Sequence, residues 1–268
     1  MNYIYGNSNY YNKIFTTNDN ISFVENLKDI PSGSNVYSRI NLTQDFKKRN
    51  NCVSGKKSKK RFEDIIDLEN NEIECMEWEI CNSKKEVECL FDKWETEFVI
   101  SKMNFSGNCK GVFVFTKNRI PNMSYDRYIF CKPVNINDGY VYKIECLYGS
   151  KVMSWVSEKD SIKKMNKNII LNIDESISKF KDYENRKICS LPKDLEKKAL
   201  LFSKEQTDEK NIGYISIDYM KDENGNYICI EYNYTNVAMH WMKSLDSYGD
   251  SYRTALINLF ENKFNNFP

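Results

Sequence analysis

Polar and apolar positions alternate along much of the chain from Phe98 onward, as they do in half-buried β-strands. Turns that contain Gly, Asn or Pro separate the alternating stretches. These stretches read EFVISKM, GVFVFTK, RYIFCKPV, YVYKIECLYG and KVMSWVS, and later YISIDYM and YICIEYN. β-Branched and aromatic residues are frequent in them, which strengthens the prediction of an extensive sheet.

Two segments have helical spacing instead. Between 192 and 205, the apolar residues Leu195, Ala199 and Phe202 recur at intervals of three or four. A second helix is expected from about 251 to 263, because its apolar residues fall on one face. That face contains Ala255, Leu256, Leu259 and Phe260. Strands and helices in this order predict an α+β fold.

The first part of the chain has a weaker pattern. Short apolar runs broken by Asn, Gly and Pro fill residues 1–45, where PSGSN predicts a turn before a strand at Val36 and Tyr37. The stretch from Lys47 to Arg61 contains eight basic residues and no apolar periodicity. We therefore expect a mobile surface loop there, with a phosphate-contacting loop as the alternative.

Composition and charge narrow the possible partners. A chain of 268 residues with 41% hydrophobic content can bury a substantial core. The charges of its 39 basic and 38 acidic residues nearly cancel, so neither nucleic acid nor a membrane is expected as a partner. No apolar stretch approaches the roughly 20 residues of a membrane span. Nine cysteines without a CxxC pair argue against zinc and a disulfide framework, and favour the cytoplasm.

The last two predicted strands are joined by a turn that contains Asn224-Gly225, a strong signal for a two-residue type I′ hairpin. Counting back along both arms from this turn places Asp218 opposite Glu231. Two carboxylates that face each other on neighbouring strands repel, which costs stability unless a proton or a cation lies between them.

Alternation along the two strands places Ser216 and Asp218 on one face with Cys229, Glu231 and Asn233. The other face is apolar and is expected to pack in the core. It contains Ile215, Ile217, Tyr219, Ile230 and Tyr232. Oxygen ligands from Asp218, Glu231 and Asn233 suit Mg²⁺, so we predict a magnesium site; the alternative is an exposed face with ordinary polar residues.

These motifs resemble the ATP-grasp superfamily. In that family a late strand with an Asp is followed by a strand ending in Glu-x-Asn, and the two bind the metal that holds the ATP phosphates. Here the matching segments are IGYISIDYM and ICIEYN, preceded by a helix with LPKDLEKKALLF. The resemblance implies two α+β subdomains that clasp ATP between antiparallel sheets. It places an ATP-binding and catalytic region at 91–268 and a reduced or divergent region at 1–90.

The resemblance extends upstream. EFVISKMNFSGNCKGVFVF is similar to the family's strand, glycine-containing phosphate loop and strand, with Lys102 in the place of the phosphate-binding lysine. Gly107 and Gly111 would let backbone amides approach the phosphates, and Lys110 would be a second contact. A simple hairpin with a Gly-Asn turn explains the same residues equally well.

Two more segments carry expected site residues. RYIFCKPV resembles the hinge that reads adenine, which implies nucleotide contacts by Phe130, Cys131 and Lys132, with Asp138 as a possible ribose contact. YVYKIECLYG resembles the strand that directs a basic residue toward the γ-phosphate, and Lys143 would take that role. Members of the family often have Arg at this position, so Lys143 departs from the pattern.

The resemblance implies an ATP- and Mg²⁺-dependent carboxylate–amine ligase. Lys102 and Lys143 would be the catalytic cations, and a small-molecule or peptide carboxylate would be activated as an acyl phosphate for attack by an amine or another nucleophile. A small-molecule kinase on the same site and a non-catalytic nucleotide-binding regulator remain alternatives. A weaker alternative is RNA binding through the basic stretch and the many tyrosines.

Overall fold

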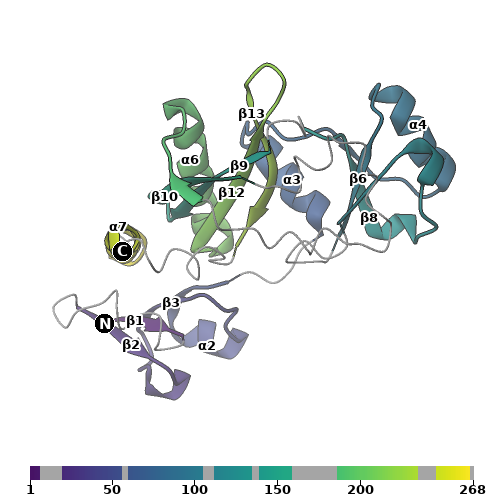
Figure 1. The fold of residues 1–268 in the computed structure, drawn as a ribbon. Helices are drawn as coiled ribbons and strands as arrows, with labels where there is room; N and C mark the ends of the chain where they lie inside the picture. The colour runs from purple at the N-terminus through teal and green to yellow at the C-terminus, as the bar shows by residue number, and fades with distance from the viewer. Residues whose placement is uncertain are drawn as a thin grey trace.

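The computed structural model describes residues 1–6, 20–55, 60–104, 112–134, 139–158, 186–234 and 246–265. These residues form three sheets, which we call the N-terminal, middle and C-terminal sheets. Figure 1 shows the N-terminal sheet below the other two, and helix α3 (Arg61–Asn70) between the middle and C-terminal sheets. No helix within the described ranges is long and apolar enough to cross a membrane.

The N-terminal sheet is parallel and has the order β2-β1-β3-β4. Its strands are β1 (Asn2–Tyr5), β2 (Ile21–Val24), β3 (Asn35–Ser38) and β4 (Asn51–Val53), which confirms the strand expected after PSGSN. The parallel arrangement was not predicted, because short strands broken by polar residues give little period-2 signal. The boundary at residue 90 stays a prediction, and residue 90 lies inside helix α4 (Lys84–Lys93).

The prediction of a loop from Lys47 to Arg61 is wrong at both ends of the stretch, where the structure has helices. Helix α2 (Gln44–Arg49) includes the first basic residues, and its N-cap Thr43 accepts a hydrogen bond from the backbone N–H of Phe46. Strand β4 follows α2, and α3 begins at Arg61. Burial of Phe46 explains the difference, because one apolar anchor with a capped first turn holds a helix too short to show periodicity.

The middle sheet is antiparallel, with the order β5-β8-β6-β7. It comprises β5 (Trp78–Glu79), β6 (Val99–Met103), β7 (Val112–Phe115) and β8 (Tyr128–Cys131). Helix α4 (Lys84–Lys93), capped by Ser83, packs Val87, Leu90 and Phe91 against one face of this sheet. Ile129 and Cys131 on the other face pack with residues of α3 and of the C-terminal sheet.

The C-terminal sheet is antiparallel and has the order β11-β10-β9-β12-β13. Its strands are β9 (Tyr140–Leu147), β10 (Ser150–Glu158), β11 (Arg186–Ile188), β12 (Tyr214–Lys221) and β13 (Tyr227–Asn233). Helix α6 (Lys193–Lys210) covers one face through Ala199 and Phe202. Helix α7 (Asp246–Leu259), followed by a π-helical turn at Phe260–Phe264, packs on the opposite face. Both predicted helices are confirmed.

The hairpin of β12 and β13 differs from the prediction near its turn. Asp222 N–H donates to the Asn226 carbonyl at 2.9 Å, so the loop has three residues, and Gly225 takes a left-handed φ of 85°. A β-bulge at Ile230 then shifts the register by one residue, since Tyr219 pairs with Cys229 whereas Asp218 pairs with Glu231. The two differences cancel, and the predicted pairing of the two carboxylates is confirmed.

The bulge changes which residues share a face. Cys229 is buried with Ile217 and Tyr219, so its predicted place beside Asp218 is wrong. Ile230 instead packs with the cluster that contains Ile129 and Cys131 of the middle sheet. An extra residue in one strand reverses the alternation on its far side, which explains both corrections.

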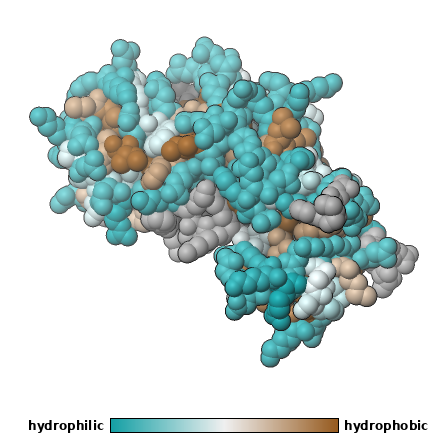
Figure 2. All heavy atoms as spheres, turned by 180° about the vertical axis from the view of Figure 1, so that it is seen from behind, coloured by the Kyte–Doolittle hydropathy of each residue, from teal (hydrophilic) through white to brown (hydrophobic). Residues whose placement is uncertain are grey.

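The surface agrees with this division into sheets and covering helices. Figure 2 shows mainly hydrophilic side chains on the face seen from behind, with hydrophobic ones in small, separate patches. Large hydrophobic residues are well exposed at six described positions. They are Met1, Ile40, Ile66, Ile80, Ile188 and Leu201. The apolar core therefore lies between sheets and helices.

Candidate active site

A row of charged side chains crosses the face of the C-terminal sheet that α7 partly covers. Lys143 of β9 is the direct neighbour of Asp218 of β12, which is the direct neighbour of Glu231 of β13. Trp155 of β10 extends the row on the other side of Lys143. Direct cross-strand neighbours point to the same face, so the register alone brings these four side chains together.

Cations flank the two carboxylates at both ends. Lys143 Nζ lies 2.8 Å from Asp218 Oδ1, and both side chains are almost buried, with 8% and 12% exposed. Burial opposes the charge on Lys143, but Asp218, with Glu145 and Glu231, raises its pKa above the ordinary value. The repulsion predicted between the carboxylates is thus relieved in part by a lysine of the same sheet.

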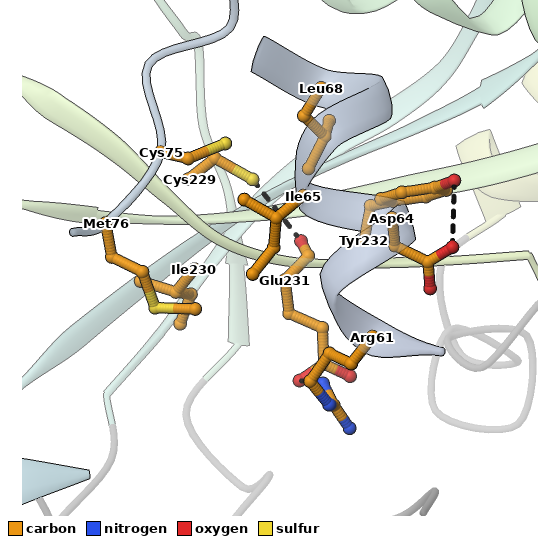
Figure 3. Close-up of a pocket in the computed structure, with 10 residues that line it drawn as sticks. All are labelled: Arg61, Asp64, Ile65, Leu68, Cys75, Met76, Cys229, Ile230, Glu231 and Tyr232. Atoms are coloured by element: carbon orange, nitrogen blue, oxygen red, sulfur yellow. Dashed lines mark hydrogen bonds and ion pairs between the residues drawn. The ribbon is translucent and has the colours of Figure 1, made fainter. Parts of the chain in front are cut away.

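Arg61 provides the second cation. It is the first residue of α3, and its Nη1 lies 3.2 Å from Glu231 Oε2 (Figure 3). Arg61 Nε also donates to the Met103 carbonyl at 3.5 Å, which ties the helix to the end of β6. Burial opposes its charge, yet the carboxylate of Glu231 holds the pKa of Arg61 above its ordinary value. The guanidinium therefore stays charged where three elements meet.

A small cavity lies behind this ion pair, between α3 and β13. Its volume is about 20 Å³, which is room for a single water. Figure 3 shows side chains of α3, β13 and the segment before β5 around it. The lining residues are Arg61, Asp64, Ile65, Leu68, Cys75, Met76, Cys229, Ile230, Glu231 and Tyr232. The cavity is too small to hold a nucleotide.

A second row lies beside the first. Glu145 of β9 pairs with Ser216 of β12, and Ser216 pairs with Asn233 of β13, so all three share the face of Asp218. Glu145 is fully buried, and burial raises its pKa despite hydrogen bonds to its carboxylate. Among the described residues, Ser216 Oγ is a buried hydroxyl with no hydrogen-bond partner.

The predicted metal ligands lie close together in the sheet. Asp218 and Glu231 are direct neighbours, and Asn233 follows Glu231 by two residues on the same face. Within the described part of the chain, no group of three His, Cys, Asp or Glu side chains is arranged to hold a metal ion. The set here is two carboxylates and an amide, all of them oxygen donors, which fits Mg²⁺ completed by water and phosphate oxygens.

Two cations contact the indole of Trp155. Lys143 Nζ lies 5.3 Å from the ring centroid, and Arg186 Cζ of β11 lies 4.3 Å from it. Both distances are within the range of cation–π attraction. Arg186 is thereby placed at the same end of the site as Lys143.

Lys102, the predicted phosphate lysine, joins the middle and C-terminal sheets. Its Nζ donates to the carbonyl of the bulged residue Ile230 at 2.8 Å and contacts Met76 Sδ at 3.4 Å. The ammonium therefore lies next to Glu231 along β13. The other residues expected in the phosphate loop, Gly107, Lys110 and Gly111, lie outside the described residues.

The expected adenine contacts are less open than the sequence suggested. Phe130 and Cys131 are fully buried, and β8 is paired on both sides, by β5 and β6. Lys132 N–H already donates to the Glu77 carbonyl at 2.9 Å, and Lys132 Nζ lies 2.8 Å from Glu77 Oε1. Asp138 lies outside the described residues. The role of this segment in adenine binding stays a prediction.

Sequence reasoning missed Arg61, Glu145 and Arg186. Arg61 is the last residue of the basic stretch that was predicted to be a loop, so its ion pair with Glu231 could not be inferred. Glu145 had a usable signal, because it follows Lys143 by two residues in an alternating strand and must share its face. Arg186 begins a three-residue strand, which is too short for any periodicity.

Comparisons with known proteins find similarity in structure and none in sequence. No protein-family model matches the chain, and no curated protein sequence matches it significantly. A Chryseobacterium gregarium RiPP-associated ATP-grasp ligase in complex with ADP and a leader and core peptide aligns with a TM-score of 0.66 at 12% identity, over 98% of this chain and 97% of that one.

Two further solved structures align over nearly their whole length. The ATP-grasp ligase PsnB, complexed with minimal precursor, Mg and ADP, has a TM-score of 0.64 at 9% identity, over 95% of this chain and 96% of that one. D-cycloserine synthetase DcsG has a TM-score of 0.61 at 8% identity, over 95% and 98%. At such identities the likeness establishes the fold.

Proposed function

The chain has the ATP-grasp fold, and we propose that it is an ATP-dependent ligase that activates a carboxylate as an acyl phosphate for attack by an amine or another nucleophile. The observation that carries this proposal is the row formed by Lys143, Asp218 and Glu231 with Arg61 at its end. Two adjacent carboxylates between two nearly buried cations form a site for a metal-bound polyanion.

Asp218, Glu231 and Asn233 would hold Mg²⁺ in this proposal. When bound, the ion would neutralise charge on the β- and γ-phosphates of ATP. The carboxylates are already in contact with Lys143 and Arg61, so each cation would be shared between a carboxylate and a phosphate oxygen. The strand register holds Lys143, Asp218 and Glu231 next to one another for this arrangement.

The proposed catalytic cations are Lys143 and Lys102. Lys143 would contact the transferred phosphoryl group from its position beside Asp218, and it stays charged at neutral pH because its pKa is held above the ordinary value. Lys102 would contact the phosphates from the middle sheet, and Gly107, Lys110 and Gly111 would line the phosphate loop. Backbone groups from Phe130 to Lys132 and the side chain of Asp138 would contact adenosine.

The reaction needs no protein nucleophile. A carboxylate oxygen of the substrate attacks the γ-phosphorus, the bond to the β,γ-bridging oxygen breaks, and ADP leaves with that electron pair. An amine then attacks the acyl carbon of the acyl phosphate, phosphate departs, and the nitrogen loses a proton as the amide forms. The protein contributes position and positive charge at each step.

A peptide carboxylate is the proposed substrate class. One structural neighbour is in complex with a leader and core peptide, and another is complexed with a minimal precursor. The third, a D-cycloserine synthetase, is named for a small-molecule product, so a small-molecule carboxylate is the alternative. The amine or other nucleophile would come from the same peptide or from a second molecule.

Thermal unfolding with nucleotides tests the ATP site. We expect ATP and ADP with excess Mg²⁺ to raise the melting temperature and GTP to do so less, because a ligand that binds only the folded state stabilises it by mass action. Asp218→Asn and Glu231→Gln should each reduce the Mg²⁺-dependent part of the shift. Asp92→Asn is the matched control, since that carboxylate is 75% exposed in the Lys117 pair and lies away from the row.

Turnover tests the reaction class. Phosphate release from MgATP that requires a carboxylate-containing peptide would support a ligase, and hydroxylamine should trap the acyl phosphate as a hydroxamate. Release of a stable phosphorylated product without hydroxamate would identify a kinase instead. No melting shift with any nucleotide in the unmodified protein would refute the proposal.

A further inference from the structure

The indole of Trp155 is held by a buried carboxylate. Its Nε1–H donates to Glu145 Oε1 at 2.9 Å, and the hydroxyl of Tyr248 donates to Glu145 Oε2 at 3.1 Å. All three side chains are at most 4% exposed. Each oxygen of Glu145 therefore has a donor from a different element, β10 on one side and α7 on the other.

This arrangement orients the ring that contacts two cations of the site. Lys143 Nζ and Arg186 Cζ both lie within 5.3 Å of the indole centroid. Two like charges near one ring repel each other, while the ring attracts each of them. Asp218 already compensates Lys143 at 2.8 Å, and the ring keeps both positive groups at the Trp155 end of the charged row, where an anionic ligand would be attracted.

The contacts form a path from α7 to the charged row. Tyr248 lies 103 residues from Glu145 in sequence, and two buried hydrogen bonds connect the C-terminal helix to the indole, which contacts the cations through its ring. A Trp ring fixed at its nitrogen has one orientation, whereas a ring without that bond can turn about its side-chain torsions. The positions of Lys143 and Arg186 would then depend on a hydroxyl that touches neither of them.

We propose that Glu145, Trp155 and Tyr248 are positioning residues that hold Lys143 and Arg186 for a bound phosphate group and make anion binding depend on the docking of α7. The proposal rests on the proposed function for the identity of the anion. It does not rest on adenine recognition, because the two cations would bind any compact polyphosphate.

Two single substitutions on α7 test the network, Tyr248→Phe as the test and Tyr252→Phe as its matched control. Tyr248→Phe removes a hydroxyl that donates to Glu145, and Tyr252→Phe removes a hydroxyl one turn later that hydrogen-bonds the hydroxyl of Tyr37 at 2.9 Å. Both rings are buried and stack on each other, so the two variants perturb packing alike. Trp155→Phe keeps an aromatic face without the nitrogen and serves as a second test of the network.

The experiment measures binding of tripolyphosphate and of MgATP by calorimetry, with intrinsic fluorescence as the reporter. We expect Tyr248→Phe to weaken tripolyphosphate binding by about tenfold and to lower kcat while KM for the carboxylate substrate is unchanged, because the loss falls on groups that stabilise transferred charge. Tyr252→Phe should bind as the unmodified protein does. The fluorescence change on binding should be smaller in Trp155→Phe, because the other tryptophans of the chain remain.

The outcomes separate this proposal from the proposed function. Equal affinities and equal kcat in Tyr248→Phe and Tyr252→Phe would overturn the positioning network and leave the ligase proposal intact. If the protein binds tripolyphosphate, more weakly only in Tyr248→Phe, but does not bind MgATP, the network would be supported and the ATP site refuted. Failure of the unmodified protein to bind either ligand would overturn both.

Discussion

Replacing Lys143 by Met tests the charge arrangement of the candidate site most directly. The change keeps the volume of the side chain and leaves Asp218 nearly buried, with 12% of its side chain exposed and Glu231 as its direct neighbour. Removing one partner of a buried ion pair costs about 3–5 kcal/mol, because the other charge remains without compensation. We expect Lys143→Met to lower the free energy of unfolding by about that amount.

The double variant separates the lost pair from lost packing. Asp218→Asn in the Lys143→Met background removes the uncompensated charge, so the double variant should be more stable than Lys143→Met alone. The pKa of Lys143 is raised in the folded state, so its contribution to stability is complete below the ordinary lysine pKa and is lost as pH rises through the folded value. The difference in free energy of unfolding between the unmodified protein and Lys143→Met should therefore be constant from about pH 6 to 9.

The assay is urea denaturation at fixed pH, with unfolding followed by circular dichroism. Lys117→Met is the matched control, because the Lys117–Asp92 pair is 48% and 75% exposed and should be worth no more than about 1 kcal/mol. Excess Mg²⁺ should restore more stability to Lys143→Met than to Lys117→Met, since the ion would lie between the carboxylates. A loss below about 1 kcal/mol for Lys143→Met would refute the reasoning.

Three further predictions concern single contacts. Burial raises the pKa of Glu145, so the protein loses stability as pH rises above the pKa of the unfolded carboxyl, about 4. In pH-resolved denaturation, Glu145→Gln should gain stability relative to the unmodified protein as pH rises above that value; a flat difference would contradict this. Gly225→Ala should cost about 1 kcal/mol, with Gly225→Asn nearer neutral, because φ is 85° and no atom lies within 4 Å to add a clash. Tyr37→Phe and Tyr252→Phe should each lower the free energy of unfolding by about 1 kcal/mol, because the two hydroxyls are 2.9 Å apart and share one hydrogen bond. The double variant should lose no more stability than either single variant, and additive losses would disprove the bond.

The hairpin shows what pattern reasoning can and cannot resolve. The pairing of Asp218 with Glu231 followed from a turn signal and a count of residues, and the structure confirms it. The turn length and the face of Cys229 were wrong, because a bulge leaves no mark in the hydrophobic pattern. The two errors have opposite effects on register, so the pairing of the carboxylates survived both.

The remaining strands of the two antiparallel sheets were predictable for a similar reason. Period-2 alternation and Gly or Asn turns marked β6 to β10, and the structure has strands in each of those stretches. The parallel N-terminal sheet was not predictable, since its strands have three or four residues each and are paired by long crossovers.

Sequence alone thus determined four of the five strands of the C-terminal sheet, the helices behind and in front of it, and the two carboxylates that face each other. Those features depend on local periodicity and on neighbours joined by one short turn. Only the tertiary structure decided that Arg61 pairs with Glu231, that Lys102 donates to Ile230 from 128 residues away, and that Tyr248 reaches Glu145. Such contacts depend on how separate elements pack, and no period along the chain encodes that packing.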